Sequence, residues 1–235
     1  MRNGFFTLPI LGFLCSGLFA EPEPAKAPAD TIVERYVAVS QAQQGRLQGA
    51  SMEVDIEADV PKLNRHGRLR ALRKISRIGR ITYDALRFEG DRSIKNEVIA
   101  RYLTAESEAR DSASLAITPA NYKFRYRGLT RSPGRLAYVL QVSPKKKKVG
   151  LFSGELWVDA ETYLPLREAG RFVKSPSIFL KKVEFVREYE IRDGVLIPRH
   201  LESSVQTRLV GMAHLSVAYT SVELSTEAVL SSDSQ

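Results

Sequence analysis

The side chains with the most versatile chemistry in this chain are three histidines and one cysteine. His66, His200 and His214 lie far apart in the sequence, and none belongs to the His-Glu-x-x-His pattern by which a helix holds a metal ion. No Gly-x-Ser-x-Gly elbow or phosphate-binding glycine loop is present. Each histidine is therefore expected in a turn or on the wet face of a strand, and the sequence predicts no metal and no cofactor.

One pair of carboxylates, Glu155 and Asp159, shares a face of a predicted strand. Four residues along a strand span about 13 Å, whereas two carboxylates that act together on one bond lie about 5 to 9.5 Å apart. The simpler interpretation is that both side chains lie on a solvated face. These patterns predict a protein that is not an enzyme.

Residues 1–20 have the features of a cleavable secretory signal. Arg2 supplies the positive charge, and an uncharged apolar run over residues 4–19 ends at Ala20, just before an acidic, proline-rich stretch. The run is shorter than the roughly 20 residues of a membrane-spanning helix, which favours cleavage over anchoring. Lipidation of Cys15 is disfavoured because Phe13 and Leu14, which are not small, precede it. The sequence thus predicts a cysteine-free periplasmic protein that depends on its core rather than on disulfides.

The chain is basic, with 35 Lys and Arg against 27 Asp and Glu and a net charge of +8. Outside the cytoplasm such a surface is expected to meet anionic lipid rather than nucleic acid. Lys145, Lys146, Lys147 and Lys148 fall in a predicted hairpin turn. They are interpreted either as a charged tip that aids solubility or as a membrane contact, since each lysine near an anionic membrane contributes about 1 kcal/mol.

The elements that must position these residues begin after a flexible leader, residues 21–30. Apolar spacing predicts a helix over residues 31–44, and strict alternation predicts a half-buried strand over residues 51–60, with one apolar and one acidic face. Two further strands are predicted over residues 68–80 and 81–88, with a turn or bulge at Ile78 and Gly79. Residues 94–109 are predicted as a second helix, although their apolar run could also form a strand.

From residue 114 onward the pattern is that of an antiparallel meander, with turn signals between alternating runs. Pro165 and Pro198 cannot donate to a strand ladder, so each marks an edge, a strand start or a break. About seven to ten strands and two helices predict an α+β fold that is mainly antiparallel β, namely a curved, unclosed β-barrel (half-barrel) with helices covering its concave face. Residues 31–224 are expected to form one domain, and residues 225–235 a polar tail.

Four features of the later chain carry a family resemblance. They are the Gly-Glu-Leu-Trp-Val-Asp strand at 154–159, the Tyr-Leu-Pro-Leu-Arg segment at 163–167, the turn at 194–198 and a final strand after Gly211. In this order the chain resembles, over about residues 30–224, the LolA-like superfamily of periplasmic lipoprotein carriers, with LolB and RseB as relatives. The resemblance implies a helical lid over an apolar cavity that binds acyl chains or lipidated proteins without chemistry.

The resemblance also implies that an arginine among the early strands regulates the lid. Five arginines of the predicted strands and turn are candidates: Arg68, Arg70, Arg73, Arg77 and Arg80. These are too many candidates for the role to be assigned to one of them.

Candidate ligand-binding residues are the large apolar side chains on the inward faces of the later strands. They are Leu136, Tyr138, Leu140, Leu156, Phe185, Tyr189, Leu201, Leu215 and Tyr219. Any of them could be core alone, because binding requires apolar surface that two helices leave uncovered. A 14-carbon chain would then contribute on the order of 10 kcal/mol before costs. Arg187 shares this face and needs a partner, which is either an acidic residue or a lipid headgroup or lid.

The function predicted from these features is that of a periplasmic carrier that binds lipidated proteins or lipid acyl chains, in outer-membrane lipoprotein sorting. The main alternative is a non-catalytic envelope sensor or scaffold, similar to RseB, that binds another envelope protein. A third interpretation, an enzyme with scattered site residues, requires an acid and a base that converge in a cavity, and a purely aliphatic and aromatic lining would exclude it.

Overall fold

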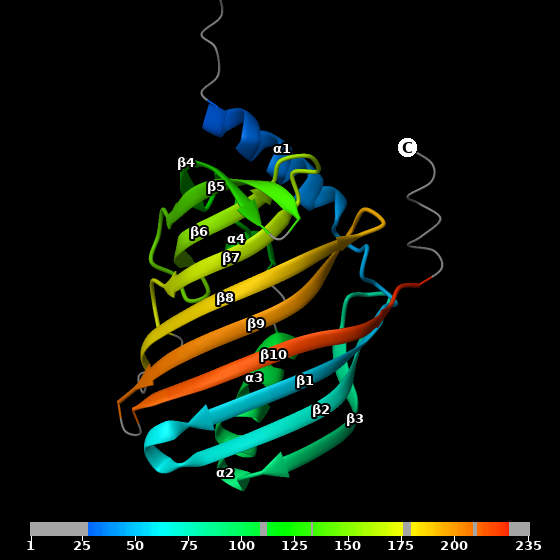
Figure 1. The fold of residues 1–235 in the computed structure, drawn as a ribbon, viewed down its shortest axis with the longest axis vertical. Coiled ribbons are helices and arrows are strands. Elements are labelled where there is room, and N and C mark those ends of the chain that lie inside the picture. The colour runs from blue at the N-terminus through cyan, green and yellow to red at the C-terminus, as the bar shows by residue number, and fades with distance from the viewer. Residues whose placement is uncertain (1–27, 109–111, 133, 176–179, 209–210, 226–235) are drawn as a thin grey trace, which may run out of the picture.

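The computed structural model describes residues 28–108, 112–132, 134–175, 180–208 and 211–225 (Figure 1). Ten strands form one antiparallel sheet in the order β3-β2-β1-β10-β9-β8-β7-β6-β5-β4. Within the described residues the two end strands, β3 and β4, do not pair with each other, so the sheet is curved but not closed. The predicted α+β half-barrel is confirmed.

The strands are bounded as follows: β1 Ser51–Val60, β2 Arg65–Ile75, β3 Ile81–Gly90, β4 Tyr122–Ser132, β5 Arg135–Pro144, β6 Phe152–Asp159, β7 Pro165–Phe172, β8 Leu180–Arg192, β9 Val195–Thr207 and β10 Met212–Glu223. The helices are α1 Pro28–Ala42, the 3-10 turn η1 Pro61–Leu63, α2 Arg92–Ile94, the π-helical turn η2 Lys95–Ile99, α3 Ala100–Glu108 and α4 Ser112–Leu115. In the part of the chain that these elements cover, no helix is both long and apolar enough to cross a bilayer.

The first predicted helix is confirmed, although it begins at Pro28, inside the predicted leader. The predicted signal, residues 1–20, and nearly all of the predicted polar tail lie outside the described residues. The second predicted helix is confirmed as the continuous run α2-η2-α3, which excludes the strand alternative. Asp91 caps its start by accepting a hydrogen bond from the backbone N–H of Ser93 at 2.7 Å.

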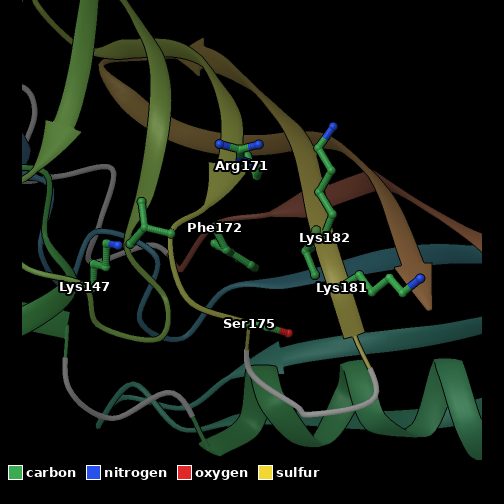
Figure 2. Close-up of a pocket in the computed structure, with 8 residues that line it drawn as sticks. Lys147, Arg171, Phe172, Ser175, Lys181 and Lys182 are labelled. Carbon is green, nitrogen blue, oxygen red and sulfur yellow. The ribbon is translucent and has the colours of Figure 1, made fainter. Parts of the chain in front are cut away.

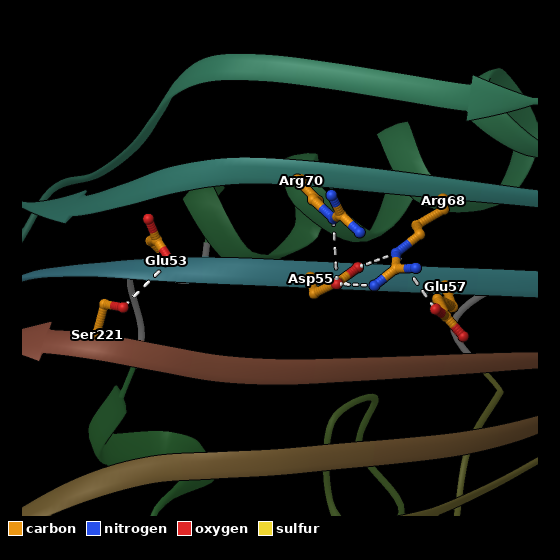
Figure 3. Close-up of polar contacts among 6 residues, drawn as sticks. All are labelled: Glu53, Asp55, Glu57, Arg68, Arg70 and Ser221. Carbon is orange, nitrogen blue, oxygen red and sulfur yellow. Dashed lines mark hydrogen bonds and ion pairs between the residues drawn. The ribbon is translucent and has the colours of Figure 1, made fainter.

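Strand β1 shows the alternation that its sequence predicts, with its apolar side chains buried and its acidic side chains facing outward. On the outer face of the sheet, Asp55 accepts from Arg68 at 2.8 Å and lies 3.5 Å from Arg70 (Figure 3). The hydrogen bond from Arg68 lowers the pKa of the Asp55 carboxyl. Arg68 and Arg70 therefore belong to a charged ladder on the side of the sheet away from the helices.

Two hydrophobic clusters lie under the two helical segments. Beneath α1, Ile32 and Tyr36 pack with residues of β4 to β8, including Leu140 and Leu156. Beneath α2-η2-α3, residues of β1, β2 and β10 pack with Ile94 and Ile99. Leu201 of β9 packs against both clusters. The middle of the concave face, near β8 to β10, therefore lies between the two helical covers (Figure 1).

The two prolines act as the sequence predicts. Pro165 is the first residue of β7, where a missing N–H is tolerated. Pro198 lies within β9 opposite Tyr189, and the register shifts between Glu188 and Tyr189 at this point. The shift confirms that Pro198 marks a break in the ladder.

Candidate functional site

A cavity of about 420 Å³ occupies the concave face between α3 and the central strands. Five of the nine predicted ligand-binding residues line this central cavity: Phe185, Tyr189, Leu201, Leu215 and Tyr219. Helix α3 adds Tyr102, Ala105 and Glu106, and β7 adds Phe172. The cavity thus lies where the two hydrophobic clusters meet, and its wall is mainly aromatic and aliphatic.

The other four predicted residues lie elsewhere. Leu140 and Leu156 are fully buried in the cluster beneath α1. Tyr138 packs against the same cluster and stacks on Tyr163, with ring centroids 6.0 Å apart. Leu136, at the start of β5, is 45% exposed. None of these four side chains lines the central cavity. Leu140, Leu156 and Tyr138 belong to the core beneath α1, whereas Leu136 faces solvent.

Arg187 lies on the cavity wall and pairs with a buried carboxylate. Its Nη1 is 3.4 Å from Oε2 of Glu168, and its guanidinium lies 4.9 Å from the ring centroid of Phe185. The partner is thus an acidic residue, which was one of the two expected interpretations. The Arg187 side chain remains 45% exposed, so a molecule in the cavity could still contact it.

A second arginine, Arg73, is almost completely buried behind the cavity. Its Nη2 donates to Oε1 of Glu106 on α3 at 2.9 Å, and its guanidinium lies 5.8 Å from the ring of Tyr219. The hydroxyl of Tyr83 also donates to Glu106, and the hydroxyls of Tyr102 and Tyr219 are 3.0 Å apart. These contacts join α3 to β2, β3 and β10.

The electrostatics of this cluster keep its tyrosines neutral and its arginine charged. Burial, followed by the nearby Glu106 carboxylate, raises the pKa of Tyr83 far above its ordinary value. Burial opposes the charge on Arg73, but Glu106, Tyr83 and Tyr219 together outweigh it and leave the pKa of Arg73 raised. The phenols are therefore hydrogen-bond donors at neutral pH, and the cluster is suited to holding α3 rather than to moving protons.

The cavity lining also includes ionisable groups. The condition that would exclude an enzyme, a purely aliphatic and aromatic lining, is therefore not fulfilled. Three of these groups are held in contacts with other charged side chains. Glu106 pairs with Arg73, Arg187 pairs with Glu168, and Nε2 of His200 lies 3.2 Å from Oε1 of Glu202.

The sequence could have identified Arg73. In β2 the residues that face the helices are the odd-numbered ones, and Leu69, Ala71 and Ile75 share that face with Arg73. Arg77 and Arg80 are exposed in the turn between β2 and β3. Alternation with apolar neighbours was therefore the signal that separates Arg73 from the other four arginines.

The three histidines and Asp159 are the other candidates for chemistry, and of these only His200 lines the central cavity. His66, His200 and His214 lie on strands, and the described residues contain no cluster of three potential metal ligands. The solvated face predicted for Asp159 is wrong, because this residue is only 1% exposed. Asp159 accepts from the backbone N–H of Thr162 at 2.8 Å and from Arg135 at 3.0 Å, and so closes the turn between β6 and β7.

The four predicted membrane-contact lysines lie exposed in the loop between β5 and β6. Lys145 donates to the backbone carbonyl of Pro119, and Lys148 donates to the hydroxyl of Ser114. Lys147 lines a second cavity, which is described below.

No protein-family model matches the chain, and no curated protein does. Among solved structures, it is similar to a DUF1329 family protein from Desulfovibrio piger, with a TM-score of 0.43 and 16% identity over 85% of this chain and 94% of that chain. A LolA superfamily protein from Nitrosomonas europaea gives a TM-score of 0.43 and 13% identity, over 84% and 93% of the two chains. The MucA/MucB complex of Pseudomonas aeruginosa gives a TM-score of 0.29 and 14% identity, over 84% and 96%. At these TM-scores and identities, the similarities leave the function of the chain to be argued from its own residues.

Proposed function

We propose that this protein is a non-catalytic periplasmic carrier that holds an acyl chain of a lipid or of a lipidated protein in the central cavity. The observation that carries the proposal is the cavity of about 420 Å³ between α3 and the middle strands. Its volume falls within the range of about 300 to 1,000 Å³ that ligand pockets occupy. Sorting of outer-membrane lipoproteins is the role that the sequence resemblance favours.

The wall of the cavity supports an apolar ligand. Phe172, Phe185, Leu201 and Leu215 present rings and aliphatic chains to the space. Each methylene that such a wall removes from water contributes about 0.8 kcal/mol, so a fully seated 14-carbon chain would contribute on the order of 10 kcal/mol before the cost of association. Burial of the chain alone is therefore sufficient to drive binding.

Helix α3 is the part of the wall that can respond to a ligand. It is tied to the sheet through the ion pair between Arg73 and Glu106, and Glu106 itself lines the cavity. Arg68 and Arg70 pair with Asp55 on the outer face, which leaves Arg73 as the arginine best placed for the lid-controlling role that the resemblance implies. In this proposal the Arg73–Glu106 pair sets how closely α3 covers the cavity.

The test is native mass spectrometry, with lipid extraction, of the protein purified from a periplasm without detergent. The expected result is a co-purifying fatty acid, phospholipid or lipopeptide at about one per chain. A protein that is bare and also rejects added acyl probes would overturn the carrier function. That result would favour the alternative of a sensor or scaffold for another envelope protein.

A further inference from the structure

A second cavity, of about 500 Å³, lies where β7 ends and β8 begins, beside the loop between β5 and β6 (Figure 2). We call it the basic basin. Its lining consists of Lys147, Arg171, Phe172, Val173, Ser175, Lys181, Lys182 and Val183. Half of these residues are cationic, and the described lining contains no carboxylate. The basin therefore concentrates positive charge, which attracts anions.

Most of this charge is not neutralised within the described part of the protein. Lys182 pairs with Glu184 at 2.6 Å. Lys147, Arg171 and Lys181 form no ion pair with any described residue. In Figure 2, Lys147 lies on the opposite side of Phe172 from Lys181 and Lys182. The cations thus border a broad space instead of converging on one point, which suits a headgroup larger than a single small ion.

The basic basin and the central cavity share one wall residue. Phe172 lines both spaces, and its ring lies 5.2 Å from that of Phe185, which lines the central cavity. On β8, Val183 of the basin and Phe185 of the cavity are two residues apart and on the same face, a separation of about 7 Å along a strand. A single amphiphile could therefore place its head in the basin and its chain over Phe172 into the cavity.

We infer that the ligand is an anionic amphiphile, with a phosphate-bearing headgroup in the basic basin and its acyl chain in the central cavity. The inference rests on the proposed acyl-binding function and adds the chemical class of the ligand. Lysine and arginine bind phosphate through charge-assisted hydrogen bonds. A phosphocholine headgroup also bears a phosphate, but its quaternary ammonium cancels the negative charge, so it would gain less from this basin.

The test compares two lysolipids with the same 14-carbon chain, lysophosphatidylglycerol and lysophosphatidylcholine, by displacement of a fluorescent acyl probe from the mature protein. At low salt, lysophosphatidylglycerol is expected to bind at least tenfold more tightly than lysophosphatidylcholine. This ratio of affinities is expected to decrease at high salt, where charges are screened. The double variant Lys147→Gln/Lys181→Gln is expected to reduce this preference to about threefold or less. The matched control Arg77→Gln/Arg80→Gln removes two exposed cations from the turn between β2 and β3 and is expected to leave the preference unchanged.

The outcomes separate this inference from the function on which it rests. Equal binding of the two lysolipids, unaffected by the lysine variant, would overturn the anionic headgroup and leave acyl binding intact. If the probe does not bind, or if neither lysolipid displaces it, the acyl-binding function itself is contradicted. A titration with inorganic phosphate forms a third arm, in which phosphate binding as tight as that of lysophosphatidylglycerol would show a site for a free anion and overturn the amphiphile.

Discussion

At the level of single residues, the two inward-facing arginines differ in how much water reaches them. The Arg73 side chain is 8% exposed and faces Glu106, whereas the Arg187 side chain, on the wall of the central cavity, is 45% exposed. A buried ion pair adds little net stability compared with apolar residues of the same shape, but removal of one partner is costly because the other charge is left without compensation. Arg73 is therefore expected to matter for the position of α3, and Arg187 for contact with the ligand.

The Arg73–Glu106 pair gives the first prediction. Arg73→Met should lower the free energy of unfolding by about 2 to 4 kcal/mol, because it leaves Glu106 partly buried and unpaired. Urea unfolding of Arg73→Met, Glu106→Gln and the double variant should give a coupling energy of about 1 to 3 kcal/mol. Lys74→Met, which breaks a half-exposed pair with Asp84, is the control and should cost less than about 1 kcal/mol. Additive effects at Arg73 and Glu106 would contradict the proposed link.

Asp159 gives a prediction about pH. Burial alone would raise the pKa of its carboxyl, but hydrogen bonds from Thr162 and Arg135 outweigh burial and lower it. A carboxyl whose pKa is lower in the folded state stabilises the protein above its unfolded pKa of about 3.9, and this contribution is lost as the pH falls through the folded value. Asp159→Asn should therefore be less stable than the wild type at pH 7, with a difference that narrows below about pH 4. Urea unfolding across this range measures it, and a difference independent of pH would contradict the role of the charge.

At the level of elements, strict alternation of apolar and polar residues predicts the strands of the sheet. It does not predict where the cavity lies. Residues 51–60 form β1 with the predicted bounds. On a half-buried strand, apolar side chains lie on the buried face and polar ones on the exposed face, so the residue types show the strand directly. The same rule places Leu140 and Phe185 on one face, and both belong to the cluster beneath α1, yet only Phe185 also lines the cavity. That difference depends on where α1 and α3 lie across the sheet. A helix that packs on strands distant from it in the sequence leaves no local pattern, so the sequence does not predict which part of the sheet the helix covers.

Helix α3 provides a test of the cavity at this scale. Thr104 and Ala105 are both exposed, but only Ala105 lines the central cavity. Ala105→Trp should fill the space and weaken binding of a fluorescent acyl probe at least tenfold, a loss of about 1.4 kcal/mol. Thr104→Trp adds a similar ring about 100° around the helix, outside the lining, and should change the affinity less than twofold. Equal affinities for the two variants would contradict a ligand site beneath α3.

At the level of the whole molecule, the central cavity lies between two hydrophobic clusters that the sheet joins. Phe185 belongs to the cluster beneath α1, while Leu215 and Tyr219 pack against the cluster beneath α2-η2-α3. All three side chains line the cavity. A ligand in this position therefore contacts both halves of the fold, and unfolding of either half would release it.

This arrangement predicts that a ligand stabilises both halves together. An acyl ligand at 100 times its dissociation constant should add about 2.7 kcal/mol, which for a domain of this size raises the melting temperature by about 5 to 10 °C. Trp157, the single tryptophan, lies on β6 in the half covered by α1, so its fluorescence follows that half, while far-UV circular dichroism follows the whole sheet. The two signals should shift by the same amount on addition of ligand. In Ala105→Phe, which partly fills the cavity without adding a second tryptophan, both shifts should be smaller. If the ligand raises the melting temperature measured by circular dichroism but not the one measured by Trp157 fluorescence, it binds only within the half beneath α2-η2-α3. That result would place the ligand outside the cavity between the two clusters.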